Sequence, residues 1–113
     1  MSIKNVIKAI PLSTFSSASL LGTYQAINAA GLPNPCTILN ITNDNTTAVT
    51  ISYDGTTDHD YVAPTSQKQI QAQTNSQVPA MLSQFPIGLI VYVKGTAGTG
   101  TIALSGYFNP QGQ

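Results

Sequence analysis

Apolar and polar residues alternate in short stretches of this chain, and turn-forming residues separate one stretch from the next. The longest regular stretch is 101–108, whose even-numbered positions, Ile102 to Phe108, are apolar or glycine and whose odd-numbered positions include Thr101 and Ser105. A period of two predicts a β-strand with one face toward a core. The stretch 89–94 is apolar on both faces, which predicts a strand in the middle of a sheet.

Eight such stretches predict an all-β protein. The expected strands are 2–10, 20–28, 37–43, 47–53, 59–63, 68–73, 89–94 and 101–108. No window of about 12 residues has the spacing of an amphipathic helix, although 15–21 could form one short helical turn. Eight short strands in 113 residues predict a single-domain β-sandwich, a jelly roll first and an immunoglobulin-like sandwich as the alternative. The Cys pair and Trp typical of immunoglobulin domains are absent.

The connections between these strands carry further expectations. Asp54-Gly55 is a turn signal, and the glycine-rich segment 96–100 is expected to join the last two strands as a hairpin. The segment 75–88 is long for a loop and contains apolar side chains, which is typical of a segment that docks on a neighbouring molecule. The alternative is that these side chains cap the core of the domain itself. Residues 1–30 are expected to be either an arm or the first strands.

Charge is scarce along the whole chain. Only 7% of the residues are charged, as four Lys and four Asp, whereas ordinary soluble domains are about a quarter charged. The four Lys are scattered singly, which excludes the basic clusters that bind nucleic acid, and no stretch has the length of a membrane span. A neutral, charge-poor surface favours a protein whose surface is covered by other copies or other proteins.

Candidate chemistry is sparse. Cys36 is the single cysteine, so no intrachain disulfide forms, and its apolar neighbours predict a buried thiol. The one ionisable cluster is 58–60, Asp-His-Asp, in which a strand would place the two Asp on one face and His59 on the other. A solvated turn or a polar contact between subunits fits it better than a metal site. With no phosphate loop or nucleophile turn in the sequence, we expect neither enzymatic activity nor a cofactor.

Several segments resemble small virion proteins of tailed bacteriophages. They are 37–43 (Thr-Ile-Leu-Asn-Ile-Thr-Asn), 49–55 (Val-Thr-Ile-Ser-Tyr-Asp-Gly), 59–64 (His-Asp-Tyr-Val-Ala-Pro), 91–95 (Val-Tyr-Val-Lys-Gly) and 100–102 (Gly-Thr-Ile). The resemblance spans about 37–108 and brings no catalytic residue with it. It implies a β-sandwich subunit of a phage particle, most similar to capsid cement or decoration proteins, which staple major capsid subunits together.

The expected partners are therefore the major capsid protein and copies of this chain itself, in a homo-oligomer located in the virion and assembled in the host cytoplasm. The expected contacts are an N-terminal arm and a second apolar patch, consisting of Ile3, Val6, Ile7, Ile10, Met81, Leu82 and Phe85. Two alternatives remain open. One is a head-to-tail connector, tail or fibre-associated protein, and the other is a carbohydrate-binding module that uses exposed tyrosines.

Overall fold

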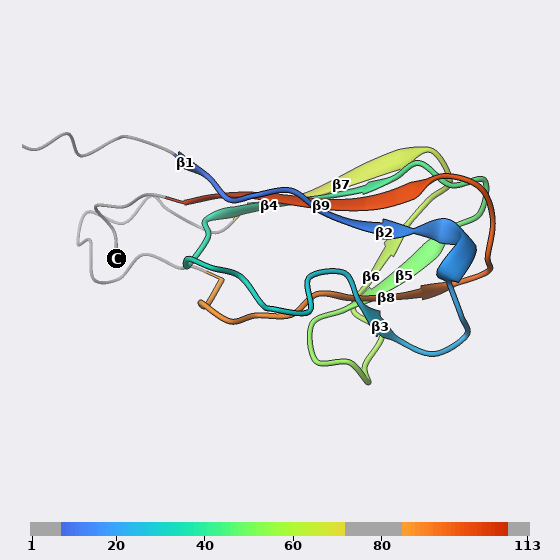
Figure 1. The fold of residues 1–113 in the computed structure, drawn as a ribbon, viewed down its shortest axis with the longest axis horizontal. Helices are drawn as coiled ribbons and strands as arrows, with labels where there is room; N and C mark the ends of the chain where they lie inside the picture. The colour runs from blue at the N-terminus through green and yellow to red at the C-terminus, as the bar shows by residue number, and fades with distance from the viewer. Residues whose placement is uncertain (1–7, 72–84, 109–113) are drawn as a thin grey trace, which may run out of the picture.

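The computed structural model describes residues 8–71 and 85–108, which form two antiparallel β-sheets stacked face to face (Figure 1). The elements in chain order are β1 (Lys8–Ala9), β2 (Ser13–Ser16), the 3₁₀ turn η1 (Ser17–Ser19), β3 (Gln25–Ala26), β4 (Ile38–Asn43), β5 (Val49–Ser52), β6 (Asp60–Val62), β7 (Ser66–Gln71), β8 (Tyr92–Gly95) and β9 (Thr101–Phe108). The predicted all-β sandwich is confirmed. None of the helices in these ranges is long and apolar enough to cross a membrane.

The strand order identifies the sandwich as a jelly roll. Sheet A has the order β1 and β2, then β9, β4 and β7, and sheet B has the order β3, β8, β5, β6. The antiparallel pairs β2–β9, β3–β8, β4–β7 and β5–β6 together make one long ribbon that folds back between β5 and β6. Rolling this ribbon up adds the pairs β4–β9 and β5–β8. Of the two predicted sandwich types, the jelly roll is therefore the one that forms.

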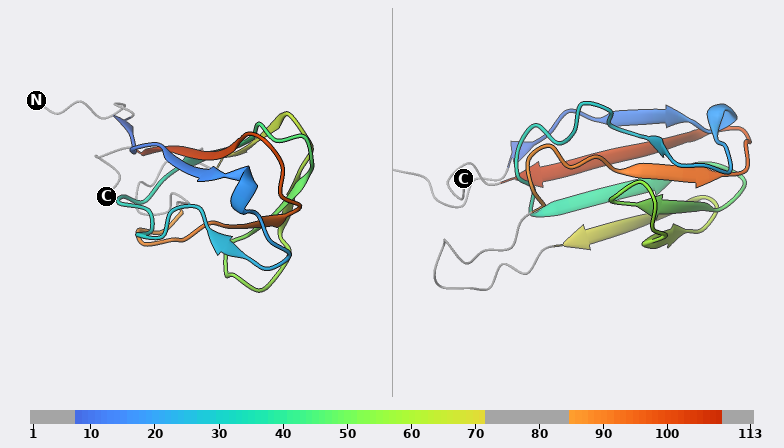
Figure 2. Two further views of the ribbon diagram at one scale, coloured as in Figure 1. Left: turned by 45° about the vertical axis from the view of Figure 1, so that its right-hand side comes forward. Right: turned by 90° about the horizontal axis from the view of Figure 1, so that it is seen from below.

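Figure 2 shows how the rolled ribbon places the strands. In its right-hand view, red β9 lies between blue β2 and blue-green β4, and yellow β7 lies at the outer edge of the same sheet. The stretch 89–94 was predicted to form a strand in the middle of a sheet. The central position is confirmed, because β8 lies between β3 and β5, although the strand itself begins at Tyr92.

The core lies between the two sheets. Sheet A contributes alternate side chains of β4 and β9, and sheet B contributes alternate side chains of β5 and β8, as the pattern of period two predicts. The most deeply buried of these are Leu39, Ile41, Val49, Ile51, Val93, Ile102 and Leu104, at 0–1% exposure. Full burial of one such aliphatic side chain stabilises the fold by about 1.5–3 kcal/mol.

A one-residue bulge lets the first strands follow β9. Ala9 lies opposite Tyr107 and Ser13 lies opposite Leu104, so the N-terminal segment advances four residues while β9 advances three. Without this extra residue every later side chain would change sides. The bulge therefore places Phe15 opposite Ile102, on the side of the core.

The segment 96–100 does not form the predicted hairpin. It leaves β8 in sheet B and enters β9 in sheet A, so it crosses from one layer to the other. Its backbone is held by a hydrogen bond from the Gly98 N–H to the Ser17 carbonyl. Gly100 has a φ of 136°, and a Cβ there would lie 1.9 Å from the Asp44 carbonyl oxygen. Glycine is thus required for the crossing, whereas the sequence predicts a turn within one sheet.

The ribbon continues past β3 and β8 as an irregular ladder. The Asn28 side chain replaces part of the backbone ladder, because its amide donates to the Leu89 carbonyl and its oxygen accepts from the Val91 N–H. Farther along, Cys36 and Phe85 exchange two backbone hydrogen bonds of 2.9 and 2.7 Å. This ladder accounts for the shortness of β3, which was expected to span 20–28.

Two other boundaries differ from expectation. The expected strand 2–10 is described only from residue 8, where β1 covers Lys8–Ala9, and the rest lies outside the described residues. The strand β2 at Ser13–Ser16 was not predicted, although the short helical turn expected within 15–21 is present at Ser17–Ser19. A segment with one large apolar residue gives no alternation to detect, and its pairing with β9 is what makes it a strand.

Candidate interaction surface

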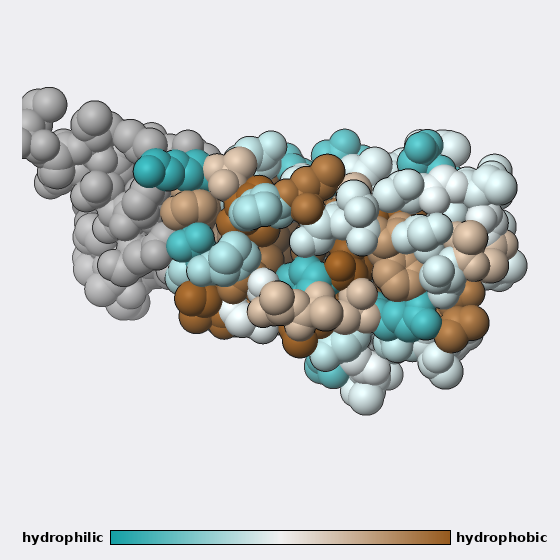
Figure 3. Space-filling model, viewed as in Figure 1, coloured by the Kyte–Doolittle hydropathy of each residue, from teal (hydrophilic) through white to brown (hydrophobic). Residues whose placement is uncertain are grey.

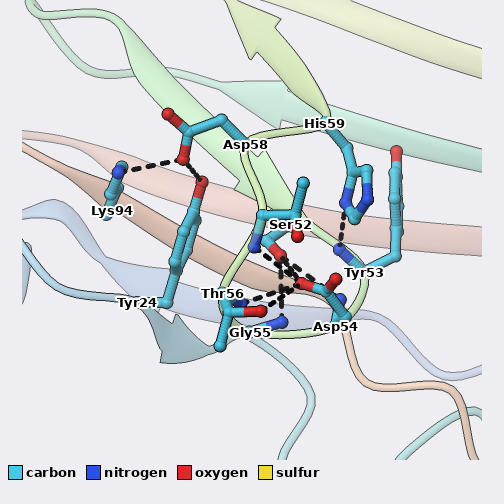
Figure 4. A network of polar contacts seen from close by, with 10 residues as sticks. Tyr24, Ser52, Tyr53, Asp54, Gly55, Thr56, Asp58, His59 and Lys94 are labelled. Carbon is cyan, nitrogen blue, oxygen red and sulfur yellow. Dashed lines mark hydrogen bonds and ion pairs between the residues drawn. The ribbon is translucent and has the colours of Figure 1, made fainter.

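The ion pairs between described residues lie on sheet B and along one open side of the sandwich. On the outer face of sheet B, Asp58 accepts a hydrogen bond from the Tyr24 hydroxyl and forms a 2.9 Å ion pair with Lys94 (Figure 4). The Lys94 ammonium also lies 4.7 Å from the centre of the Tyr24 ring, which adds a cation–π attraction. Tyr24 and Lys94 both lower the pKa of Asp58, while desolvation and the Asp58 hydrogen bond raise the pKa of Tyr24 to about 12.

The loop that follows β5 is held by one carboxylate. Asp54 Oδ1 accepts from the backbone N–H groups of Thr56 and Thr57, both at 2.8 Å, and from the Ser52 hydroxyl at 2.8 Å. These donors hold the pKa of Asp54 well below its usual range, because they stabilise the charged form. Figure 4 shows the bonds converging on one side chain within its own loop. Asp54 therefore organises the turn, as its Asp-Gly sequence predicts.

His59 and Asp60 do not act together with Asp58. The His59 Nδ1 accepts from the Tyr53 N–H at 3.0 Å, and its ring stacks on the Tyr53 ring with centroids 5.4 Å apart. Asp60 opens β6 and points the other way, where it accepts from the Tyr53 hydroxyl and pairs with Lys68 at 3.5 Å. The prediction that Asp58 and Asp60 share one face is wrong, because Asp58 lies before β6 and reaches Lys94 on the outer face of sheet B, whereas Asp60 points inward toward Lys68.

The ionisable side chains of this cluster are engaged in contacts within the protein. Within 8–71 and 85–108, no three His, Cys, Asp or Glu side chains are placed to hold a metal ion together. Each of the three carboxylates just described already accepts hydrogen bonds from the protein. Cys36 is fully buried, and burial raises the pKa of its thiol, which disfavours the reactive thiolate.

The outer face of sheet A is different, because no charged side chain points outward from it among the described residues. Residues opposite one another in antiparallel strands point to the same side of a sheet, so the strand register defines the face. The outward residues are Thr14, Ser16, Ile38, Asn40, Thr42, Gln67, Gln69, Gln71, Thr101, Ala103, Ser105 and Tyr107. We call this surface the amide–hydroxyl face. The charged residues nearest to it are Lys8 of β1, whose register partner Phe108 places it on the inner side, and the exposed Asp44 just past the end of β4.

Lys68 is a charged residue within β7, but its side chain does not belong to the amide–hydroxyl face. It lies between Gln67 and Gln69 on β7, and its register partner is the buried Ile41, so it points toward the inside of the sandwich. There its ammonium pairs with Asp60 of β6 across the open side between the two sheets. The ion pair closes that side of the sandwich and leaves the outer row of β7 purely amide.

Asn40 lies near the middle of the amide–hydroxyl face. It is 8% exposed and stands between Gln69 on β7 and Ser105 on β9. Its Oδ1 is buried and accepts no hydrogen bond from any described residue. An unpaired buried acceptor costs about 1–3 kcal/mol, so this position costs stability unless a donor comes from outside the described residues.

One end of the same face is hollowed into an open groove of about 500 Å³. Its walls come from β2, β4, β7 and β9 and from the ends of adjoining loops. The lining residues are Leu12, Thr14, Thr42, Asn43, Asp44, Thr65, Ser66, Gln67, Thr101 and Ala103. Hydroxyl and amide groups dominate, and Leu12 adds an apolar side chain that is 63% exposed. The groove contains no aromatic ring on which a sugar could stack.

The predicted interface residues fall in three places. Ile10 is 7% exposed and belongs to the core of the domain, so its side chain is not part of an arm. Phe85 is half-buried and packs against the same core, in agreement with the alternative that the loop caps the domain itself. The remaining ones lie outside the described residues, and they are Ile3, Val6, Ile7, Met81 and Leu82.

Sequence reasoning missed both surfaces described here. Tyr24, Asp58 and Lys94 are separated by more than 30 residues from one another, and no spacing in the sequence indicates that they meet. The amide–hydroxyl face could have been found in part, because 67, 69 and 71 are glutamines at every second position. By itself that pattern predicts only a strand with one polar face. Figure 3, viewed as in Figure 1, shows strongly hydrophilic residues scattered among pale and brown, hydrophobic ones.

Comparison with known proteins assigns no family. No family model and no curated protein matches the sequence. Among solved structures, one of the Bacillus endospore appendages that "form a novel family of disulfide-linked pili" is similar at 16% identity and a TM-score of 0.47. The match covers 92% of this chain and 87% of the other. A likeness at this level does not carry function from one protein to the other.

Proposed function

We propose that this chain is a structural subunit of a larger assembly, and more specifically a capsid cement or decoration protein of a tailed bacteriophage. The observation that carries the proposal is the amide–hydroxyl face, a whole sheet surface without an outward charge. Free monomers usually keep charged residues on such surfaces for solubility. Neutral polar groups are instead suited to a buried interface, where charged residues are depleted.

The fold is compatible with this role but does not decide it. Jelly rolls occur in viral capsid proteins, in lectins and in cupins, so the architecture alone leaves several functions open. The resemblance of 37–108 to small phage virion proteins favours the first of these. A decoration protein acts by burying neutral β-surface at junctions between capsid subunits, repeated over the whole shell. A contact of ordinary size buries about 1,600 Å².

A binding role is favoured over a catalytic one by the way the ionisable side chains are used. Asp54 holds its own loop, Asp58 holds Tyr24 and Lys94, and Asp60 holds Tyr53 and Lys68. These carboxylates serve the stability of the sandwich. A general acid or base would need a free position facing a bound substrate.

The carbohydrate-binding alternative has less support. Such modules stack sugar rings on exposed aromatic side chains, yet Lys94 covers the Tyr24 ring and Gly55 packs on the Tyr92 ring. Tyr61 is exposed, at 65%, but it lies away from the groove on the amide–hydroxyl face. A lone exposed tyrosine is a weak platform for a glycan chain.

The test is the location and copy number of the chain in particles purified from the cells that produce it. A decoration protein co-sediments with DNA-filled shells at a copy number comparable to that of the major capsid protein, measured by gel densitometry. A copy number matching a single ring would favour the connector or tail alternative. Absence from every particle fraction would overturn the proposed function.

A further inference from the structure

We propose that the amide–hydroxyl face is the contact surface between two copies of this chain, packed sheet A against sheet A about a two-fold axis. The inference deepens the proposed structural role and rests on it, because it names the first partner in the assembly. It draws on three features of the described residues, namely the placement of charge, the unpaired Asn40 acceptor and the protected edge of β7.

Charge placement favours a second copy as the partner. In a two-fold interface each surface meets a copy of itself, so any charge near the axis faces a like charge. The amide–hydroxyl face avoids this, since apart from Ile38 its strands direct hydroxyl, amide and small side chains outward. Hydroxyl and amide groups both donate and accept hydrogen bonds, which makes such a surface complementary to itself in many registers.

The Asn40 side chain is the second feature. Its Oδ1 is buried without a partner, at a point flanked by Gln69 and Ser105 on the neighbouring strands. A facing copy brings amide N–H and hydroxyl O–H donors to the same region. A rotation of the Asn40 side chain would bring this oxygen to them, and pairing it would then remove the cost of an unsatisfied buried acceptor. The position near the middle of the face is where the contact would exclude water best.

The free edge of β7 is a less suitable contact. Edge strands can add to a second sheet through their unpaired backbone groups, and β7 is the longest strand at a sheet edge here. Its centre, however, carries Lys68, directed inward and paired with Asp60 across the open side. An inward charge on an edge strand is a common protection against edge-to-edge association. The face, in contrast, has no such protection.

Other kinds of partner fit the face less well. A nucleic acid or a strongly charged protein would find no opposite charge on it, and an apolar surface would leave its hydroxyl and amide groups unpaired. A neutral polysaccharide could form hydrogen bonds with the groove, but the groove has no aromatic platform. Binding of such a polymer would therefore count against a second copy as the partner.

Sedimentation equilibrium of the full chain over a wide concentration range tests the inference. The unmodified chain is expected to show a reversible monomer–dimer equilibrium. Gln69→Lys places a charge beside Asn40, where it would meet its own copy across the axis. We expect the dimer dissociation constant to rise about tenfold or more. Gln69 is exposed, so the variant keeps its fold, which thermal unfolding followed by circular dichroism verifies.

Tyr61→Lys is the matched control, because it adds the same charge at an exposed strand position on the outer face of sheet B. Its dissociation constant should equal that of the unmodified chain. A chain that stays monomeric at millimolar concentration would overturn the inference, and so would equal weakening by both substitutions. So would a monomer that binds neutral dextran or cellulose through Gln69.

The failure of this inference is distinguishable from the failure of the proposed function. A chain that is monomeric in solution but co-sediments with phage shells would lose the two-fold contact and keep the structural role. A dimer that is absent from every particle would keep the contact and lose the proposed location.

Discussion

At the scale of single residues, buried asparagine side chains join distant parts of this charge-poor chain by hydrogen bonds. Asn43 is 0% exposed and lies at the end of β4. Its amide donates to the carbonyl oxygens of Thr47, Val62 and Ala63, and its Oδ1 accepts from the Asn45 N–H. One side chain thus fastens the turn after β4 to the end of β6 in the opposite sheet.

Asn43→Ala should therefore destabilise the fold by about 3 kcal/mol, because it leaves several buried carbonyl groups and one N–H without a partner. Urea unfolding at neutral pH measures the change in the free energy of unfolding. Asn40→Ala is the matched control on the same strand. Its Oδ1 has no partner among the described residues, so its loss should cost the monomer less than about 1 kcal/mol. Equal costs for both substitutions would contradict the assigned role of Asn43.

The Asp54 turn gives a prediction about pH. Its pKa is lowered in the folded chain by the Thr57 and Thr56 N–H groups and the Ser52 hydroxyl. A carboxylate with a lowered pKa contributes stability that is fully present above its unfolded pKa of about 3.9 and is lost as the pH falls through the folded value. Asp54→Asn should lower the melting temperature at pH 7, and the gap to the unmodified chain should narrow below pH 4.

Melting curves at several pH values between 2 and 7 measure this gap. Asp44→Asn serves as the control, because Asp44 is an exposed carboxylate just past the end of β4. Its melting temperature should follow that of the unmodified chain over the whole range. If the Asp54→Asn gap stayed constant down to pH 2, hydrogen bonding to the charged form would not be the source of the stability.

At the scale of elements, alternation predicted the strands whose one face is buried and failed where pairing alone makes the strand. The strand 101–108 is present as β9 with its predicted inward side, since Ile102 and Leu104 are fully buried. The short β2 could not be predicted, because its own residues show no alternating pattern. It is a strand only because it pairs with β9. Glycine spacing likewise indicated a tight connection at 96–100 but could not indicate that the chain changes sheets there.

The crossing between the sheets should be intolerant of a side chain at its last residue. Gly100→Ala combines a φ of 136° with a Cβ only 1.9 Å from the Asp44 carbonyl oxygen. We expect a loss of about 3 kcal/mol or more, from backbone strain and overpacking together. Gly22→Ala is the control, since a Cβ there meets nothing within 4 Å. Thermal unfolding compares the two, and a tolerated Gly100→Ala would refute the close approach.

At the scale of the whole molecule, the few charges are distributed unevenly. Composition predicted a charge-poor surface, but only the rolled ribbon determines which strands end up with the charges. Lys94 and Asp58 meet on sheet B, and Lys68 and Asp60 close one open side, so the outer face of sheet A remains neutral. Contacts between residues far apart in sequence produce this segregation, and no local pattern encodes it.

A neutral contact face also fixes how association should respond to salt. Ion pairs across an interface weaken as the Debye length falls from about 30 Å at 0.01 M to about 3 Å at 1 M ionic strength. Hydrogen bonds between amides and hydroxyls carry no net charge to screen. The dissociation constant of the dimer should therefore change less than about twofold over this range, measured by sedimentation equilibrium. In the Gln69→Lys variant the two like charges are screened by salt, so its dimer should become tighter as salt is added. A dimer of the unmodified chain that dissociates in high salt would instead mean that charged groups form the contact, and the association would have to be assigned to a surface other than the amide–hydroxyl face.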